Sequence, residues 1–260
     1  MDYETLKVTR QDHVAILAFN RPEALNALNT AVARELPVAL REAADDDEIS
    51  AAVLTGEGDR AFCVGADLKE RKTMSRAEVA RQRELFVHAF TAVVEFTKPL
   101  VAAVNGFCLG GGLEFALACD FIIASETAVF GLPEVGLAII PGGGGTQLLP
   151  RIVGRNQAKE LIFTGRRFPA AEAQRLGLAN YVVPAGELRE KTLAVMREIA
   201  GNGPIALRQA KRAINLGLEV ELRTALLLEA ECYNACLHSE DRDEGLRAFN
   251  EKRPPVYRGR

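Results

Sequence analysis

Tryptophan is absent from this 260-residue chain, and histidine is scarce, with only His13, His88 and His238. Aromatic residues make up 6% of the chain, so few side chains are available to stack on a sugar ring. This argues against a two-carboxylate glycosidase. With three histidines and no G-x-S-x-G sequence, a Ser-His-Asp hydrolase is also poorly supported.

Long apolar runs and excess charge of one sign are also lacking. The longest uncharged apolar candidate, VGLAIIPGGGGTQLLP (135–150), is broken by glycine and proline, so we expect no membrane span. The net charge of −3 provides no general attraction to nucleic acid or an anionic membrane. The opening residues, MDYETLKVTRQDH, have early acids and no apolar centre, so we expect no secretory signal.

Cysteine is used sparingly, with five residues and no C-x-x-C pair. This usage indicates reduced thiols in a cytoplasmic protein. Cys232, Cys236 and His238 cluster on a predicted helix, but their spacing does not put all three on one face. We therefore expect core cysteines and no metal site.

Two glycine-containing stretches resemble nucleotide motifs only in part. GEGDRA (56–61) fits the dinucleotide pattern, but Glu57 and Asp59 would repel a pyrophosphate. PGGGGTQ (141–147) lacks the lysine of a P-loop. Neither stretch supports a nucleotide-binding function.

Four short apolar runs in the first half predict β-strands. They cover residues 13–20, 50–56, 100–106 and 121–125. Helix-like segments lie between them, which favours crossover connections and parallel pairing over hairpins.

Helical patterns account for most of the remaining chain. Apolar residues recur at helical spacing over 75–96, and 26–44 also predicts a helix, which Pro37 should kink or interrupt. From about residue 155 onward the pattern is almost entirely helical. We therefore expect an α/β core followed by a helical C-terminal part.

Three consecutive glycines, 110–112, lie at the start of a predicted helix, where glycine costs roughly 1 kcal/mol relative to alanine at each interior position. Amides at a helix N-terminus are unpaired and partly positive, and glycine lets another molecule approach them. The Gly111 N–H could therefore donate to an oxygen that becomes negative during a reaction. Ala66, at another predicted strand exit, is the candidate for a second donor.

Two glutamates accompany these amides. Glu114 lies within one turn of Gly111, and Glu134 follows in an apolar stretch. Two acids in an apolar pocket raise the pKa of one, so that one can activate water while the other donates a proton. Taken singly, a glycine run is most often a turn and such a glutamate is most often on the surface, and spacing alone does not show that they converge.

Six segments together resemble the crotonase, or enoyl-CoA hydratase/isomerase, superfamily. They are 20–29, 61–70, 98–125, 130–154, 158–184 and 245–260. The resemblance implies a spiral of β-β-α units over 1–195 and a helical C-terminal trimerisation region over 196–260. It also implies a homotrimer, or a homohexamer formed as a dimer of trimers.

Site roles follow from the same resemblance. It implies that the amides of Ala66 and Gly111 form an oxyanion hole, that Glu114 activates water and that Glu134 protonates Cα. Further positions are implied to bind the coenzyme A (CoA) thioester or the water beside it: Ala24, Leu25, Asp67, Leu68, Lys69, Gly142, Phe249 and Lys252. The last two reach the CoA nucleotide, often from a neighbouring subunit. CoA is part of the substrate, so no separate cofactor and no metal are expected.

The complete pair of acids favours a hydratase over the isomerase and decarboxylase branches, which commonly lack one or both. An isomerase of the same superfamily is the alternative. The chain looks most like methylglutaconyl-CoA hydratases of leucine breakdown, and a short-chain enoyl-CoA hydratase is as plausible. A methylglutaconyl group would need a cation, which Arg71 or Lys72 could supply, although a solvated surface role is more common for such residues.

Some methylglutaconyl-CoA hydratases also bind AU-rich RNA through lysines on an early helix. Here the matching stretch has Arg34 and Arg41, no lysine, and acids at its end. RNA affinity comes largely from neutralising phosphates, so nucleic acid is not the expected partner. An AU-rich RNA-binding protein is kept as the hypothesis from another class.

Overall fold

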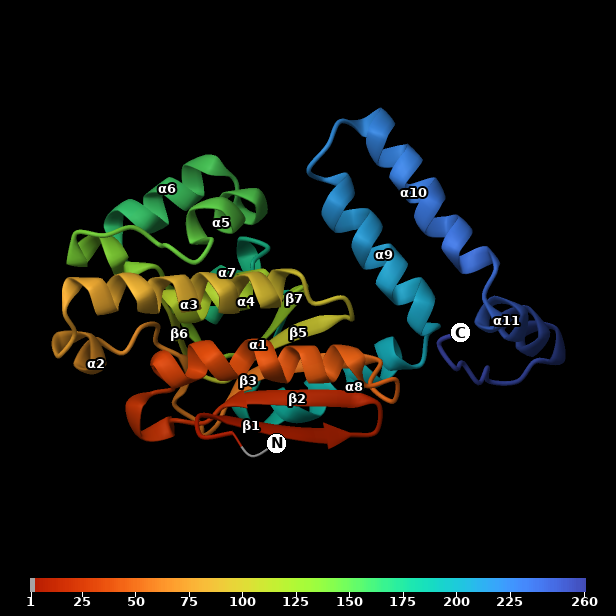
Figure 1. The fold of residues 1–260 in the computed structure, drawn as a ribbon, viewed down its shortest axis with the longest axis horizontal. Helices are drawn as coiled ribbons and strands as arrows, with labels where there is room; N and C mark the ends of the chain where they lie inside the picture. The colour runs from red at the N-terminus through yellow and green to blue at the C-terminus, as the bar shows by residue number, and fades with distance from the viewer. Residues whose placement is uncertain (1–2) are drawn as a thin grey trace.

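Two β-sheets form the centre of the molecule, and helices pack around them (Figure 1). The computed structural model describes residues 3–260. The larger sheet contains, in spatial order, β1 (Leu6–Gln11), β2 (Val14–Phe19), β3 (Ala51–Gly56), β5 (Leu100–Val104), β7 (Phe121–Ser125) and β10 (Tyr181–Val183). The smaller sheet contains β4 (Ala61–Cys63), β6 (Phe107–Leu109), β8 (Val129–Gly131) and β9 (Phe168–Pro169).

The chain visits the two sheets in turn, one strand to each, and then forms helix. After β3 and β4 come α2 (Leu68–Lys72) and α3 (Arg76–Val94), and after β5 and β6 comes α4 (Gly111–Ala118). After β7 and β8 come the short 3-10 helix η2 (Pro133–Leu137), α5 (Gly145–Val153) and α6 (Arg155–Thr164). The expected α/β fold of repeated β-β-α units is confirmed. Its consequence is that the β4–α2 and β6–α4 turns lie side by side, because β4 and β6 are neighbours in the small sheet.

The four predicted strands correspond to β2, β3, β5 and β7, and the parallel pairing of these strands is confirmed. The sequence did not indicate β1, which pairs antiparallel with β2 in a hairpin. Four of the six residues of β1 are exposed, so it lacks the apolar run that marked the central strands. The strands of the small sheet have two or three residues each, too short to produce a pattern.

Pro37 was expected to kink or interrupt this segment, and the interruption does not occur, because helix α1 (Thr30–Asp45) continues through it. Proline removes one backbone hydrogen bond. Burial of Leu36, Leu40 and Pro37 itself on the face that packs against the core offsets that loss. The helix starts at residue 30 rather than 26, where the Asn29 side chain accepts a hydrogen bond from the Val32 N–H.

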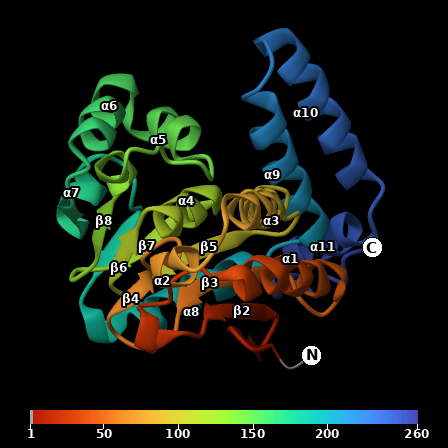
Figure 2. The same ribbon diagram turned by 60° about the vertical axis from the view of Figure 1, so that its left-hand side comes forward.

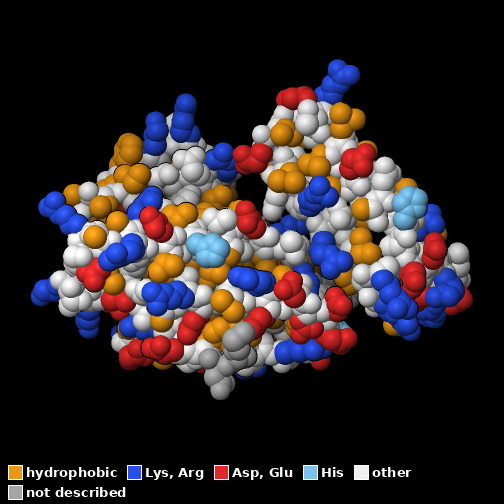
Figure 3. Space-filling view, viewed as in Figure 1, with side chains coloured by type: hydrophobic (Ala, Val, Ile, Leu, Met, Phe, Trp, Pro, Cys, Tyr) orange, Lys and Arg blue, Asp and Glu red, His pale blue; other side chains and the backbone are white. Residues whose placement is uncertain are grey.

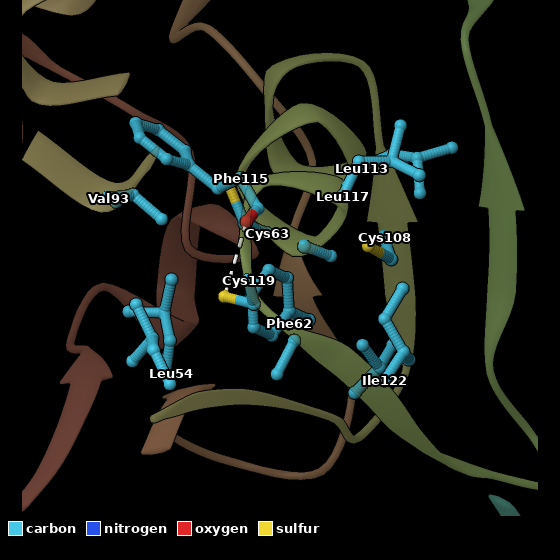
Figure 4. Packing of buried hydrophobic residues seen from close by; sticks show 14 of the residues in the cluster. Leu54, Phe62, Cys63, Val93, Cys108, Leu113, Phe115, Leu117, Cys119 and Ile122 are labelled. Atoms are coloured by element: carbon cyan, nitrogen blue, oxygen red, sulfur yellow. Dashed lines mark hydrogen bonds between the residues drawn. The ribbon is translucent and has the colours of Figure 1, made fainter. Parts of the chain in front are cut away.

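The main core lies between the larger sheet and helices α1, α3 and α4. Phe62, Phe115 and the thiols of Cys63, Cys108 and Cys119 are buried together there (Figure 4). All five cysteines are free. Burial raises the pKa of the Cys63 thiol to about 12, so it packs as a small neutral side chain.

Helices dominate the C-terminal part, as the sequence predicted. α7 (Ala170–Arg175) precedes β10, and α8 (Leu188–Ala200) packs on the larger sheet through Leu188, Val195 and Met196. α9 (Pro204–Gly217) and α10 (Leu222–Leu237) form an antiparallel pair that projects away from the sheets, followed by α11 (Glu240–Glu251) (Figures 1 and 2). Within residues 3–260, no helix is long and apolar enough to cross a bilayer.

The projecting α9–α10 pair and the turn between its helices carry exposed apolar side chains among charged ones. Leu218 is 81% exposed and Leu222 is 73% exposed, and no residue of α9 is buried. Hydrophobic side chains lie on this part of the molecule beside the hollow that separates it from the core (Figure 3). A single chain thus leaves a contiguous apolar region uncovered, which is typical of an interface.

Gly112→Ala is expected to destabilise the protein, because a Cβ at this position would lie 2.1 Å from the Cys63 carbonyl oxygen. Backbone must shift to relieve this contact, and overpacking of this kind costs about 1–3 kcal/mol or more. Urea unfolding measures the loss. Gly186→Ala is the matched control, since a Cβ there meets nothing within 4 Å. Equal stabilities of the two variants would contradict this packing.

Candidate active site

One pocket of about 640 Å³ opens beside the first turn of α4. Its walls come from α2, α3, the first turn of α4, η2 and the loop that follows η2. The lining is largely apolar, with Leu28, Phe86 and Phe90 among its side chains. Glu114 and Glu134 both line it, as do Ala66 and Gly111. The four residues for which the sequence predicted catalytic roles therefore converge in one pocket.

The Ala66 N–H is left unpaired by the way its segment is held. The Leu28 N–H donates to the Gly65 carbonyl at 2.8 Å, and the Asp67 N–H donates to the Leu28 carbonyl at 2.9 Å. These two bonds fix the backbone on either side of Ala66 and do not use its own N–H. No acceptor for the Ala66 N–H occurs in the described part of the chain.

The Gly111 N–H is unpaired because Gly111 is the first residue of α4, where no intrahelical acceptor exists. Gly65 adopts φ +85°, and a Cβ at that position would lie 3.0 Å from the Gly111 nitrogen. The backbones of the two turns are thus in close contact. Two free N–H groups on adjacent turns can donate to the same oxygen atom, which is the arrangement of an oxyanion hole.

Glu114 is buried, and its oxygen Oε1 accepts hydrogen bonds from the Gly143 N–H at 2.7 Å and the Gly145 N–H at 2.8 Å. Burial raises the pKa of Glu114, and these two bonds oppose that rise. A Cβ at Gly143 would lie 2.9 Å from Oε2 of Glu114. The glycines of 142–145 therefore let the backbone reach the carboxylate.

Glu134 lies in the first turn of η2, and its oxygen Oε2 is buried without a hydrogen-bond partner among residues 3–260. Burial is the main cause that raises the pKa of Glu134 to about 7, and the nearby charge of Glu114 raises it further. Gly110, with φ +54°, faces this side chain, since a Cβ there would lie 3.1 Å from Oε1. One acid is thus held by amides, and the other is free to exchange a proton near neutral pH.

Only some of the other residues predicted to bind CoA line the pocket. Leu68 and Gly142 line the pocket, whereas Ala24, Leu25 and Lys69 do not. Asp67 begins α2 by accepting hydrogen bonds from the Lys69 and Glu70 amides. It also pairs with Arg21 at 2.9 Å, which ties the segment of Ala24 and Leu25 to the start of α2.

Phe249 and Lys252 are outside the pocket. They lie in and directly after α11, at the opposite end of the molecule from α2 (Figure 1). Phe249 is 83% exposed. Within one chain, the structure does not bring these two residues to the site.

Several pocket residues were missed by the sequence reading. From α3 they are Val79, Arg83, Phe86, Val87 and Phe90, and from the loop after η2 they are Ile139 and Ile140. The α3 residues recur at helical spacing, so their common face was readable. The sequence did not show which segments this face of α3 contacts, because the turns before α2 and α4 and the loop after η2 are distant from it in sequence.

The family described as Enoyl-CoA hydratase/isomerase matches residues 9–260, nearly the whole chain. This chain belongs to that family. The superfamily resemblance stated from the sequence is therefore confirmed. The match includes both acids and both unpaired amides, so the pocket lies inside the family's domain.

Enoyl-CoA hydratases of this family are similar to the chain over nearly its full length. The chain is 43% identical to a short-chain-enoyl-CoA hydratase of Clostridium acetobutylicum and 41% identical to a crotonyl-CoA hydratase of Syntrophomonas wolfei, each over 97% of both chains. A solved structure of enoyl-CoA hydratase from Bacillus anthracis is 45% identical, with a TM-score of 0.97 over 99% of this chain and 100% of that one.

Titration of Glu134 is expected to make stability depend on pH. The pKa of Glu134 rises from 4.5 to about 7 on folding, so the folded state favours the protonated form. This contribution is complete below pH 4.5 and is lost as the pH rises through about 7. Glu134→Gln should therefore flatten the fall in unfolding free energy between these pH values, as measured by urea unfolding. Glu126→Gln, at an exposed position, is the control, and an unchanged slope in Glu134→Gln would refute the assignment.

Proposed function

We propose that this protein is an enoyl-CoA hydratase that adds water across the α,β double bond of a short-chain enoyl-CoA thioester. The observation that carries the proposal is one apolar pocket with two unpaired amides, from Ala66 and Gly111, and two glutamates, the buried Glu114 and the half-buried Glu134. The names of the full-length relatives from Clostridium acetobutylicum and Syntrophomonas wolfei support the same chemistry.

The first step is polarisation of the thioester. Its carbonyl oxygen accepts from the Ala66 and Gly111 N–H groups, and negative charge moves onto that oxygen as the nucleophile adds at Cβ. Removing one such donor typically costs about 10²–10³ in rate. The amides are already held by the Leu28 bonds and the α4 turn, so they need no rearrangement when charge develops.

Water addition uses the two acids in different states. Glu114 is bound at Oε1 by two amides, which leaves Oε2 to accept a proton from water as the water oxygen bonds to Cβ. Glu134 transfers its proton to Cα, and the product is the 3-hydroxyacyl thioester. A carboxyl with a pKa of about 7 suits this donor role near neutral pH. Gly142 would contribute to the backbone around the water.

Both acids are present, which supports hydration over isomerisation. An isomerase needs to move one proton between two carbons and has no water to activate. The pair of glutamates, one held by amides and one with an unpartnered oxygen, provides separate groups for the water and for Cα. Methylglutaconyl-CoA as the substrate, and a cytoplasmic location, stay predictions.

The assembly we propose is a homotrimer or a dimer of trimers. The uncovered apolar region of α9 and α10 supports it, with Leu218, Leu222, Leu227 and Tyr233 each more than 60% exposed. Packing with another copy would remove these side chains from water. In such an assembly Phe249 and Lys252 of one subunit would serve the CoA nucleotide bound by another.

Glu114→Gln and Glu134→Gln are each expected to lower crotonyl-CoA hydration by about 10²–10⁴-fold, the usual contribution of a positioned acid or base. Glutamine keeps an oxygen that can accept from the Gly143 and Gly145 amides, so the fold is retained. Loss of the enoyl-thioester ultraviolet absorbance measures the rate. Glu126→Gln is the control, and wild-type rates in both pocket variants would refute the mechanism.

Leu227→Arg is expected to weaken the assembly, because Leu227 is 66% exposed on α10 and a charge there would be buried on association. Sedimentation velocity should show three or six copies for the wild-type protein and smaller species for the variant. Val8→Arg places the same charge on β1, far from this helix pair, and should leave the assembly intact. A wild-type monomer would contradict the proposal.

A further inference from the structure

The turn that carries the Ala66 amide is attached to the segment before α1 by a single parallel β-bridge between Leu28 and Ala66. Two backbone hydrogen bonds make this bridge, and neither of them involves the amide that the reaction would use. The side chains that bind both segments therefore bear on where the Ala66 N–H points.

Arg21 binds both segments with one guanidinium group. Its Nη1 donates to the Ala27 carbonyl at 2.7 Å, directly before Leu28. Its Nη2 pairs with Oδ2 of Asp67 at 2.9 Å, directly after Ala66. A guanidinium is planar and its donors have a fixed spacing. The two bonds therefore hold the Ala27 carbonyl and the Asp67 carboxylate at a set separation.

Asp67 is bound through its backbone and through both carboxylate oxygens. Its Oδ1 accepts from the Lys69 and Glu70 amides at 3.0 and 3.2 Å, which begins α2. Its own N–H donates to the Leu28 carbonyl at 2.9 Å. The Asp67 side chain is 11% exposed and that of Arg21 is 20% exposed, so water and salt screen the pair less than they would on the surface. The residue directly before Asp67 has correspondingly little freedom.

Asn26 attaches the Arg21 turn to the strand that leads to Ala66. Its side chain is buried, with Oδ1 accepting from the Arg21 N–H at 2.9 Å and Nδ2 donating to the Ala61 carbonyl at 2.7 Å. Ala61 is the first residue of β4. Asn26 adopts φ +57°, a conformation that asparagine tolerates better than most residues. The Arg21 turn is thus bonded to the chain on both sides of the amide, at Ala61 and at Asp67.

We propose that Arg21 is a positioning residue for the reaction. Through Asp67 it holds the Ala66 amide where the thioester oxygen becomes negative. Neither Arg21 nor Asp67 lines the pocket, so the arginine acts through the amide and does not touch the reacting atoms. Its charge is already paired with a carboxylate, which disfavours a role in binding CoA phosphates. The inference rests on the proposed hydratase, because it assigns the Ala66 amide to the thioester.

Arg21→Gln is expected to lower kcat for crotonyl-CoA hydration about 10- to 100-fold, the usual effect of a small misplacement in an active site. KM should stay within about twofold, because the oxyanion develops only in the transition state. Arg21→Lys keeps the charge but loses the two-donor geometry, so it should recover only part of kcat. Arg10→Gln is the matched control, since Arg10 also binds one carbonyl, of Asp12, and one carboxylate, of Glu48, outside the pocket.

The infrared band of a bound thioester reports the amide without turnover. Butyryl-CoA is saturated and unreactive, and hydrogen bonds to its C=O group lower the stretching frequency of that group. With the carbonyl carbon isotopically labelled, the band should lie lower on the wild-type protein than in the free thioester. Arg21→Gln should lose part of this shift, and Arg10→Gln should keep all of it. A variant that was only less stable would bind the thioester with the wild-type band.

Asp67→Asn tests whether Arg21 acts through Asp67. Asparagine begins a helix about as well as aspartate, so α2 should be retained while the ion pair is lost. If the two residues act as one unit, the double variant Arg21→Gln, Asp67→Asn should be no slower than the slower single variant. If Arg21→Gln does not fold, as judged by circular dichroism, Arg21→Lys and Asp67→Asn carry the same kinetic and infrared measurements.

Wild-type kcat or an unchanged carbonyl band in the Arg21 variants would overturn the positioning role, and so would a rise in KM alone. Losses that multiply in the double variant would overturn the coupling to Asp67. The wild-type protein separates this inference from the hydratase. Absence of crotonyl-CoA hydration together with an unshifted band would refute the hydratase, whereas an active protein whose band is insensitive to Arg21 would refute only this inference.

Discussion

The buried Glu114 carboxylate and the two amides that bind it are the interaction on which the site depends. Gly143 and Gly145 donate to one oxygen and so join α4 to the loop before α5. A buried acid without partners is costly, so this loop has little freedom to lie elsewhere. Phe90 packs against Gly144 between the two donors, which places α3 as the opposite wall. The pocket is therefore shaped around one charged group.

Glycine makes this closeness possible, at a cost in local stability. Side chains at Gly110 and Gly143 would approach the carboxylates of Glu134 and Glu114 to about the closest distance that real contacts allow. The turns at Gly65 and Gly110 also use backbone conformations that other residues rarely adopt. Glycine lowers helix stability at the start of α4, and it allows two unpaired amides and two acids to line the same pocket. That exchange explains Gly110 and Gly111, and close packing on the Cys63 backbone explains Gly112.

Much of the core was predictable because its strands are buried on both faces and read as apolar runs. β2, β3, β5 and β7 were found for this reason. β1 was not, since four of its six residues are exposed and it has no buried apolar run, and the strands of the small sheet are too short for any periodicity. Pro37 does not interrupt α1, because tertiary burial of the helix outweighs one missing hydrogen bond. Local propensity yields to packing at such positions.

Residue identity by itself determined the chemistry that this chain can perform: reduced cysteines, scarce histidine, two glutamates in apolar surroundings and glycines at a helix start. Only the tertiary structure decided which of these groups meet. Glu114 is bonded to amides about thirty positions further along the chain, and Arg21 is paired with Asp67 beside the Ala66 amide. Such contacts depend on how the β-β-α units stack, and stacking is set by burial of the whole core rather than by any local pattern.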